Sequence, residues 1–143
     1  MAAAALRAVC APPGSRREAC APPQPSGGTR YRPCAACVVF NRSRELLVGE
    51  RLDKPGQWQF AQGGVDGGGA EGACAAAARE LWEEMGLRAT CSAGRGAVGM
   101  VGAVSPPLKY DVPPGTWLEG AGFAGQEVTF VLFYYGGDGL PTA

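Results

Sequence analysis

Residues 79–87 read Arg-Glu-Leu-Trp-Glu-Glu-Met-Gly-Leu, and this stretch decides how the rest of the chain is interpreted. Its carboxylates, Glu80, Glu83 and Glu84, are spaced i, i+3 and i+4, so on a helix they share one face, with neighbouring Cβ atoms roughly 5–6 Å apart. Like charges at this spacing repel, and only Arg79 is near enough to offset them. Three oxygen donors on a short arc suit a hard divalent ion such as Mg²⁺ or Mn²⁺. A solvated acidic face is the alternative for such a cluster taken by itself.

The residues around these glutamates predict a helix that ends before Gly86. Cys74, Ala78, Leu81 and Met85 recur at intervals of four, three and four, an apolar stripe that we expect to pack into a core. Gly86 is placed to adopt the left-handed conformation that often follows the C-terminus of a helix. The glutamates are then expected to lie together on the exposed side of this helix.

Residues 62–69 read Gln-Gly-Gly-Val-Asp-Gly-Gly-Gly and predict a loop before the helix. Glycine backbone approaches a phosphate or a metal closely because it has no Cβ. Glu71 follows, and we expect it in the first helical turn, where the positive end of the helix dipole stabilises an anion by about 0.3–1 kcal/mol. A glycine-rich loop therefore leads into a helix that carries an acidic cluster.

Together these features resemble the Nudix box, G-x5-E-x7-R-E-U-x-E-E-x-G-U, in which U is apolar. The match is complete from Glu71 to Leu87. One position departs, because the box places a glycine six residues before Glu71 and this chain has Val65 there. Compared with relatives whose loop begins Gln-Gly-Gly, the loop reads as carrying two additional residues.

The resemblance implies an α/β Nudix fold, an α-β-α sandwich with a mixed β-sheet, for residues 30–143. It implies a divalent cofactor, Mg²⁺ or Mn²⁺, held by Glu80, Glu83, Glu84 and a backbone carbonyl of Gly63 or Gly64. It assigns catalysis to Glu83, Glu80, Arg79 and Glu71, with Arg79 holding a carboxylate in place and Glu71 supporting the geometry between loop and helix. One glutamate of the box acts as base, and an imidazole base is excluded because the chain has no histidine.

Three further segments narrow the resemblance: residues 31–33 (Tyr-Arg-Pro), 51–53 (Arg-Leu-Asp) and 58–60 (Trp-Gln-Phe). They are similar to the branch that contains bacterial RNA pyrophosphohydrolases, and within it they resemble plant and algal relatives that hydrolyse dinucleoside polyphosphates. The resemblance implies that Arg32 and Arg51 contact substrate phosphates, for which a planar guanidinium is suited; ordinary surface arginines are the alternative. Relatives continue past residue 136 with a further acid, strands and a closing helix, so we expect the domain to be incomplete at its C-terminus, with Glu127 as the nearest substitute acid.

Residues 34–40 and 46–51 predict two β-strands joined by a turn. Cys34 and Cys37 form a Cys-x-x-Cys in the first of them, but strand residues three apart face opposite sides. Because there is no histidine and no second such pair, we interpret both as packing residues and not as zinc ligands or a redox pair. The six cysteines show no repeated spacing that would define a disulfide framework.

A chain of 143 residues has room for one domain. Residues 1–33 carry five arginines and one acid, and the remainder carries 8 basic and 12 acidic residues, so the domain lacks the broad basic surface of a protein that holds long nucleic acid tightly. Residues 1–29 are rich in Ala, Pro, Arg and Ser and lack an apolar run that would span a bilayer. They fit a transit peptide for the chloroplast or another organelle, or a disordered tail, and we expect them to lie outside the fold; without such targeting the chain would be cytoplasmic.

The resulting hypothesis is a Mg²⁺-dependent hydrolase that cleaves phosphoanhydride bonds of dinucleoside polyphosphates or related nucleotides. Divalent metals offset phosphate charge, orient the chain and lower the pKa of a bound water. Hydrolysis at RNA 5′ ends is one alternative, and a truncated, inactive relative that binds nucleotide is another. No membrane partner is expected.

Overall fold

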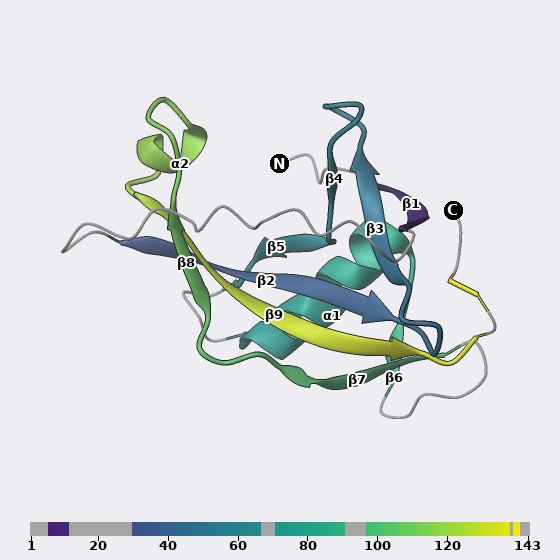
Figure 1. Cartoon of the computed structure of the whole chain (residues 1–143). Helices are drawn as coiled ribbons and strands as arrows, with labels where there is room; N and C mark the ends of the chain where they lie inside the picture. Colours follow the sequence, from purple (N-terminus) through teal and green to yellow (C-terminus); the bar gives the residue numbers. More distant parts are fainter. Residues whose placement is uncertain (1–5, 12–29, 67–70, 91–96, 138, 141–143) are drawn as a thin grey trace.

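The computed structural model describes residues 6–11, 30–66, 71–90, 97–137 and 139–140, the first of these ranges by its backbone alone. These residues form a mixed β-sheet, one long helix and one helix of four residues (Figure 1). The strands are β1 (Leu6–Ala11), β2 (Tyr31–Phe40), β3 (Leu46–Arg51), β4 (Trp58–Gln59), β5 (Gln62–Gly64), β6 (Ala89–Thr90), β7 (Val98–Ala103), β8 (Leu108–Asp111) and β9 (Gly125–Tyr135). The helices are α1 (Ala73–Met85) and α2 (Trp117–Gly120).

β2 and β9 run parallel to each other through the centre of the sheet. β3 and β5 pair antiparallel with β2 along its other edge, and β7 and β8 pair antiparallel with the other edge of β9. β1 and β4 pair with β3, and the short β6 pairs with β7. The described strands therefore make a nine-stranded mixed sheet, and the predicted α/β class is confirmed.

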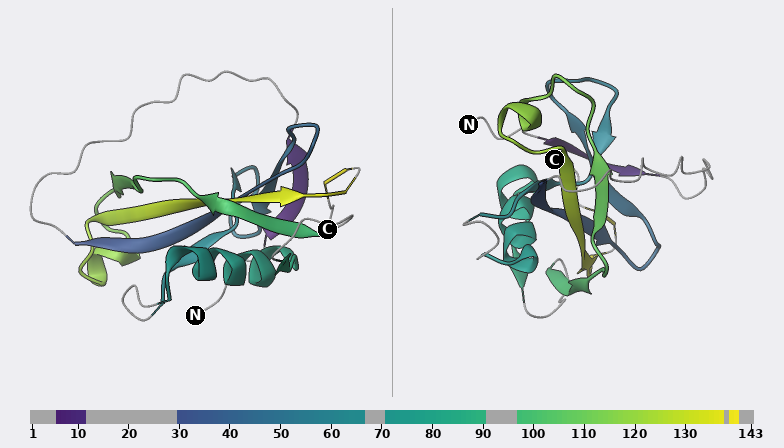
Figure 2. Two further views of the ribbon diagram at one scale, coloured as in Figure 1. Left: turned by 90° about the horizontal axis from the view of Figure 1, so that it is seen from below. Right: turned by 90° about the vertical axis from the view of Figure 1, so that its left-hand side faces the viewer.

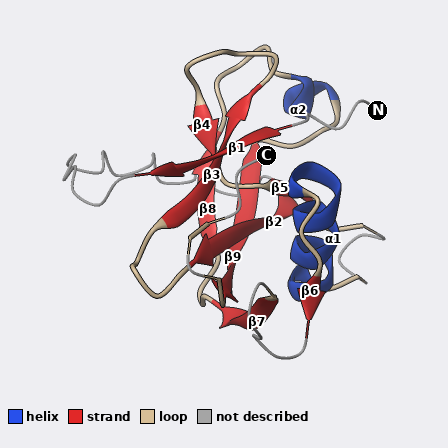
Figure 3. Cartoon of the chain, turned by 90° about the vertical axis from the view of Figure 1, so that its right-hand side faces the viewer, coloured by secondary structure: helices blue, strands red, loops and turns tan. Residues whose placement is uncertain are grey.

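α1 lies along one face of this sheet (Figures 2 and 3). Ala35, Cys37 and Val39 of β2 are buried beneath it, because alternate residues of a strand point to the same face. The same core contains Leu47, Ala61, Ala76, Ala77, Leu81, Val98, Val131 and Phe133. Full burial of a large apolar side chain stabilises the fold by about 1.5–3 kcal/mol, so this layer fixes where α1 sits.

The side of α1 that meets the sheet differs slightly from the predicted apolar stripe. Leu81 is buried and Cys74 and Met85 pack against the core, as predicted. Ala78 is only half-buried, and Ala77, four residues before Leu81, is fully buried in its place. The small alanine side chains let the helix approach the sheet closely, and the rotation turns part of the acidic cluster toward the sheet as well.

Both ends of α1 depend on glycine. α1 begins at Ala73 with Gly72 as its N-cap, so Glu71 lies before the helix and the prediction of a first-turn position is wrong. The reason is the backbone of Gly72, whose φ of 76° is outside the helical range. At the other end Gly86 has the predicted left-handed conformation, with φ of 66°, and its N–H donates to the Trp82 carbonyl at 3.0 Å.

The predicted strands at residues 34–40 and 46–51 are confirmed as β2 and β3. Cys34 and Cys37 are buried free thiols on opposite faces of the sheet, Cys37 beneath α1 and Cys34 in a smaller cluster with Ala36 and Val128. The Cys37 thiol donates to the Ala77 carbonyl at 3.0 Å, and burial raises its pKa to about 12. Both cysteines are thus packing residues, as predicted, and the Cys34 thiol also accepts a hydrogen bond from Arg32 Nη1 at 3.6 Å.

Leu6–Ala11 forms the edge strand β1, paired antiparallel with β3. The expectation that residues 1–29 lie outside the fold is therefore wrong for these six residues. They read Leu-Arg-Ala-Val-Cys-Ala, without proline, whereas Pro12 and Pro13 follow and have no N–H to donate to a sheet. The rest of this segment, and with it the interpretation as a transit peptide, lies outside the described residues. No helix within the described ranges is both long and apolar enough to cross a bilayer.

Candidate active site

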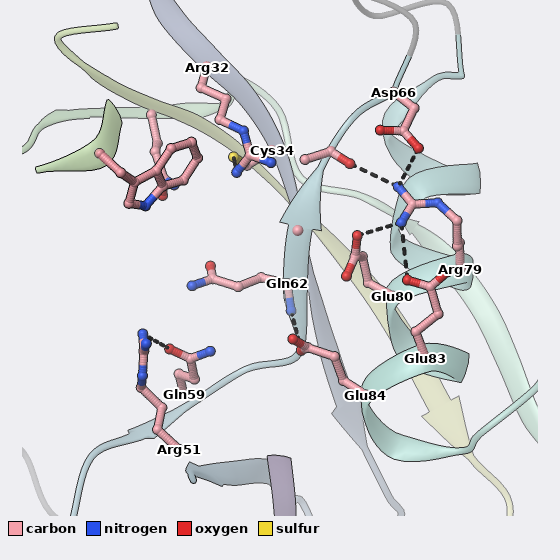
Figure 4. Close-up of a pocket in the computed structure, with 14 residues that line it drawn as sticks. Arg32, Cys34, Arg51, Gln59, Gln62, Asp66, Arg79, Glu80, Glu83 and Glu84 are labelled. Carbon is pink, nitrogen blue, oxygen red and sulfur yellow. Dashed lines mark hydrogen bonds and ion pairs between the residues drawn. The ribbon is translucent and has the colours of Figure 1, made fainter. Parts of the chain in front are cut away.

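A pocket of about 570 Å³ lies where the edge strand β5 meets α1. In Figure 4 the glutamates and Arg79 lie on one side of β5, Arg32 lies on the other, and Arg51 and Gln59 lie below. The lining residues are Arg32, Cys34, Arg51, Gln59, Gln62, Gly63, Gly64, Asp66, Arg79, Glu80, Glu83, Glu84, Trp117 and Gln126. Eight of the nine predicted site residues are among them, and the ninth, Glu71, is bonded to Arg79.

Arg79 links Glu71, which precedes the N-cap of α1, to the acidic cluster. Its Nε and Nη2 donate to the two carboxylate oxygens of Glu71 at 3.0 and 3.1 Å. Its Nη1 donates to Glu80 Oε1 at 2.6 Å and lies 3.4 Å from Glu83 Oε2, while Nη2 also donates to the Gly64 carbonyl at 2.9 Å. The hydrogen bond from Arg79 lowers the pKa of Glu71, so this carboxylate stays ionised. The predicted ion pair between Arg79 and a carboxylate is present.

Glu80 is 9% exposed and lies against the backbone of Gly63. A Cβ at Gly63 would stand 2.0 Å from Glu80 Oε1, so only glycine leaves room for this carboxylate. A buried carboxylate needs a charged or hydrogen-bonding partner, which Arg79 provides. The expectation that all three glutamates share an exposed face is therefore wrong: Glu83 is exposed, whereas Glu80 is buried.

Glu84 is half-buried and accepts a hydrogen bond from the Gln62 N–H at 3.0 Å. Burial, with the charges of Glu80 and Glu83 adding to it, raises the pKa of Glu84 to about 7, against the opposite effects of the Gln62 N–H and Arg51. Burial is thus the main reason that the neutral form of this carboxyl group is favoured, and repulsion by the two neighbouring glutamates is a smaller one. A cation bound nearby would favour the ionised form.

The donor chemistry of the cluster fits a hard divalent cation, because glutamate and backbone carbonyl oxygens are ligands that Mg²⁺ and Mn²⁺ accept. Among the described residues, however, no three His, Cys, Asp or Glu side chains are gathered closely enough to form a complete metal site. Mg²⁺ commonly takes only one or two carboxylates and fills its shell with waters and substrate phosphates. The assignment of Glu80, Glu83, Glu84 and a carbonyl of Gly63 or Gly64 as ligands stays a prediction.

The two arginines predicted to contact phosphates both line the pocket. Arg51 donates to both carboxylate oxygens of Asp53, at 2.9 and 2.7 Å. The guanidinium carbon of Arg32 lies 5.1 Å from the centre of the Trp117 ring. Both are thus held by neighbours at the pocket, and their contact with phosphate stays a prediction.

Six lining residues were not predicted as site residues: Cys34, Gln59, Gln62, Asp66, Trp117 and Gln126. Gln62 and Asp66 belong to the glycine-rich segment, so their place beside the predicted site residues could have been predicted from the sequence. Gln126 reaches the pocket because the parallel register of β2 and β9 pairs it with Arg32, for which no local sequence signal exists. Trp117 lies on a four-residue helix that has no periodic pattern.

The fold and the pocket agree with a comparison to known families. The NUDIX domain model matches residues 30–133, which is more than half of the chain. The chain therefore belongs to the NUDIX family, and the resemblance seen in the sequence is confirmed.

Within this family, the chain is similar to curated proteins named RNA pyrophosphohydrolase. It is 37% identical over 114 residues to the protein of that name from Cereibacter sphaeroides, and the alignment covers 76% of this chain and 64% of the relative. It is 34% identical over 119 residues to that of Agrobacterium fabrum, covering 76% and 64%. It is 40% identical over 84 residues to that of Sphingopyxis alaskensis, covering 58% and 48%. The chain thus spans less than two thirds of the length of these relatives.

Two solved structures share the fold. The C. elegans Ap4A hydrolase aligns with a TM-score of 0.52 at 18% identity, covering 80% of this chain and 76% of that one. The MutT protein of Methanosarcina mazei Go1 aligns with a TM-score of 0.50 at 17% identity, covering 82% and 72%. At these identities the likeness concerns the fold alone.

Proposed function

We propose that this chain is a divalent-metal-dependent pyrophosphohydrolase that cleaves phosphoanhydride bonds in nucleoside diphosphates linked to a further group. The observation that carries the proposal is a single pocket in which glutamates of α1 lie across from arginines of β2 and β3 (Figure 4). The acidic side suits a metal cation and the basic side suits a polyphosphate. Membership of the NUDIX family supports the same conclusion.

In this proposal Arg32 and Arg51 bind and orient the phosphates. A guanidinium donates two parallel hydrogen bonds to phosphate oxygens and keeps its charge at any physiological pH. Asp53 holds the Arg51 guanidinium in place, and its pKa is lowered by the hydrogen bonds from Arg51, so it stays ionised. The substrate is thereby held with its anhydride oxygens toward the glutamates.

Glu80, Glu83, Glu84 and a carbonyl of Gly63 or Gly64 are the residues that would hold the metal. A bound divalent ion would offset the phosphate charge and lower the pKa of a coordinated water. One glutamate of the cluster accepts the proton of the attacking water, since the chain has no histidine for this role. Arg79 and Glu71 keep the cluster in place through the hydrogen bonds described above.

We favour dinucleoside polyphosphates as substrates. Residues 34–143 carry 8 basic and 12 acidic residues, which suits a compact nucleotide better than a long polyanion. A protein named Ap4A hydrolase, from C. elegans, shares the fold, which is compatible with this choice of substrate.

The test is direct. The purified chain with Mg²⁺ and diadenosine tetraphosphate should release mononucleotides, and a chelator should stop the release. Glu83→Gln should abolish it, because Glu83 is exposed in the pocket and the change removes charge with little effect on packing. Glu127, the substitute acid considered from the sequence, pairs with Lys109 at 3.4 Å and does not line the pocket, so the structure gives no support to that role. Glu127→Gln is therefore the matched control, and its rate should stay within about twofold. Release that survives chelation or Glu83→Gln would overturn the proposal.

Hydrolysis at RNA 5′ ends is the second candidate, because the curated relatives that match this chain carry that name. Competition between a 5′-triphosphorylated oligoribonucleotide and diadenosine tetraphosphate separates the two through the ratio of their kcat/KM values. A chain that melts cooperatively and is stabilised by both ligands but turns over neither would instead be a nucleotide-binding relative without activity.

A further inference from the structure

α2 brings an exposed tryptophan to the pocket from a distant part of the chain. Leu118 is 4% exposed and anchors α2 in the fold, and its carbonyl accepts a hydrogen bond from the Phe123 N–H at 2.9 Å. The Ala124 N–H donates to the carbonyl of Arg30 at 3.0 Å, and the Arg30 guanidinium carbon lies 5.2 Å from the centre of the Phe123 ring. α2 is thereby fixed beside the start of β2 (Figure 1).

This placement sets the indole of Trp117 against the guanidinium of Arg32, with 5.1 Å between the guanidinium carbon and the ring centre. Arg32 is also packed against the backbone of Gly64, where a Cβ would stand 2.2 Å from Nη2. The guanidinium is thus confined by an aromatic ring and by a glycine that has no side chain to displace it. A confined guanidinium in the pocket is suited to hold a phosphate at a fixed position.

Most of the Trp117 indole serves no packing role. The residue is 64% exposed, the largest exposed fraction among the large apolar residues that the structure describes. Trp82 shows that stacking with an arginine does not by itself mark a site: the Arg88 guanidinium carbon lies 3.7 Å from its ring centre, yet neither residue lines the pocket. What distinguishes Trp117 is a free aromatic surface beside the arginine to which we assign a phosphate.

We infer that Trp117 is the base-stacking residue of this pocket, on which the nucleobase joined to the Arg32-bound phosphate lies flat. The inference rests on the proposed function, from which it takes the phosphate-binding role of Arg32. Stacking on an aromatic side chain tolerates any base, because every base has a π face. Purines, which have the larger face, bind more tightly than pyrimidines.

The experiment compares a methylene-bridged ATP analogue, the corresponding UTP analogue and inorganic tripolyphosphate, each titrated calorimetrically with Mg²⁺. Trp117→Ala should weaken binding of the ATP analogue by about 5- to 150-fold and that of the UTP analogue by less. The affinity for tripolyphosphate should fall clearly less than that for the ATP analogue, by about two- to fivefold at most, because only the contact between the ring and Arg32 is lost. Trp117→Phe should retain most of the affinity for both analogues. Trp82→Ala is the matched control and should change none of the three.

An equal loss for the ATP analogue and tripolyphosphate would overturn the inference, because Trp117 would then act only through Arg32. Unchanged affinities in Trp117→Ala, or no binding of the ATP analogue by the unmodified chain, would overturn it too. Turnover measured alongside separates the two proposals. If the ATP analogue binds in a way that depends on Trp117 but the chain hydrolyses no substrate, the proposed function alone is overturned. If the unmodified chain and Trp117→Ala hydrolyse the substrate with the same kcat/KM, the base-stacking role alone is overturned.

Discussion

Arg79 donates hydrogen bonds to both carboxylate oxygens of Glu71, from Nε to Oε1 at 3.0 Å and from Nη2 to Oε2 at 3.1 Å. Glu71 Oε2 also accepts the Asp66 N–H at 3.0 Å, so the pair connects the residues on either side of positions 67–70. The same guanidinium donates to Glu80 at 2.6 Å. The Arg79 side chain therefore joins Glu71, which precedes the N-cap of α1, to the acidic cluster that we propose as the metal site.

Replacing this guanidinium by an ammonium group, which has the same charge but no planar set of donors, should weaken the hydrogen bonds that hold the cluster. Arg79→Lys should lower kcat/KM by about 10- to 100-fold, the usual cost of losing a residue that orients metal ligands, because lysine cannot donate to Glu71 and Glu80 in a fixed planar geometry. Steady-state kinetics with Mg²⁺ measure the effect. Arg88→Lys makes the same change just after the end of α1, beside Trp82 and outside the pocket, and should have little effect. Equal kinetics for the two variants would contradict the role of Arg79.

Alanine substitutions at the two adjacent glycines of β5 should lower kcat/KM in different ways. A Cβ at Gly63 would stand 2.0 Å from Glu80 Oε1, so Gly63→Ala should displace a cluster carboxylate and lower kcat by about tenfold or more. A Cβ at Gly64 would stand 2.2 Å from Arg32 Nη2, so Gly64→Ala should move a flexible guanidinium and mainly raise KM. Gly120→Ala is the control, because a Cβ there meets nothing within 4 Å. The same split between kcat and KM for both variants would contradict this assignment.

The site could be predicted from the sequence wherever its chemistry is local. The glutamates of α1, Arg79 and the glycines of β5 lie within a short stretch, and fixed spacing along one helix determines which of them come together. The burial of Glu80 was missed because residues 75–78 are all alanine, and four identical small residues do not mark which side of the helix meets the sheet. Which carboxylate is exposed depends on this rotation.

Non-local pairing accounts for what the sequence did not predict. Trp117 reaches Arg32 because β8 pairs with β9 and β9 pairs with β2, and no pattern near residue 117 encodes these pairings. β1 was missed for a similar reason, since a six-residue edge strand takes its register from β3 and is surrounded by sequence rich in Ala and Pro. Strands are stabilised by their neighbours across the sheet more than by their own sequence.

Without metal, the chain should become less stable as the pH rises from about 4.5 to about 7. The pKa of Glu84 is about 7 in the folded state against an ordinary value of 4.5, so the folded state binds more protons than the unfolded state in this window. The free energy of unfolding therefore falls with pH there. Because Glu84 is only half-buried, solvent screening reduces the loss to about 1 kcal/mol. No imidazole titrates in this window, since the chain has no histidine.

Urea unfolding in metal-free buffer at pH 5 and pH 7.5 checks this pH dependence. Glu84→Gln should remove most of the difference between the two pH values, because the amide does not titrate. Glu127→Gln should keep it, since Glu127 lies outside the pocket. If the difference in stability between the two pH values persists unchanged in Glu84→Gln, the effect belongs to another titrating group.

Mg²⁺ should reverse the dependence of the free energy of unfolding on pH. A cation held by the cluster favours ionised carboxylates, and binding to Glu84 must displace the proton that a pKa of about 7 retains at lower pH. Stabilisation by Mg²⁺ should therefore grow from pH 5 to pH 8, to about 2.7 kcal/mol at a hundredfold excess over Kd. Thermal melts with Mg²⁺ or with a chelator at both pH values measure it. Glu83→Gln and Glu84→Gln should each lose most of the gain at pH 8, and Glu127→Gln should keep it. A gain of equal size at both pH values, or one that survives in both pocket variants, would place the metal away from the glutamates of α1.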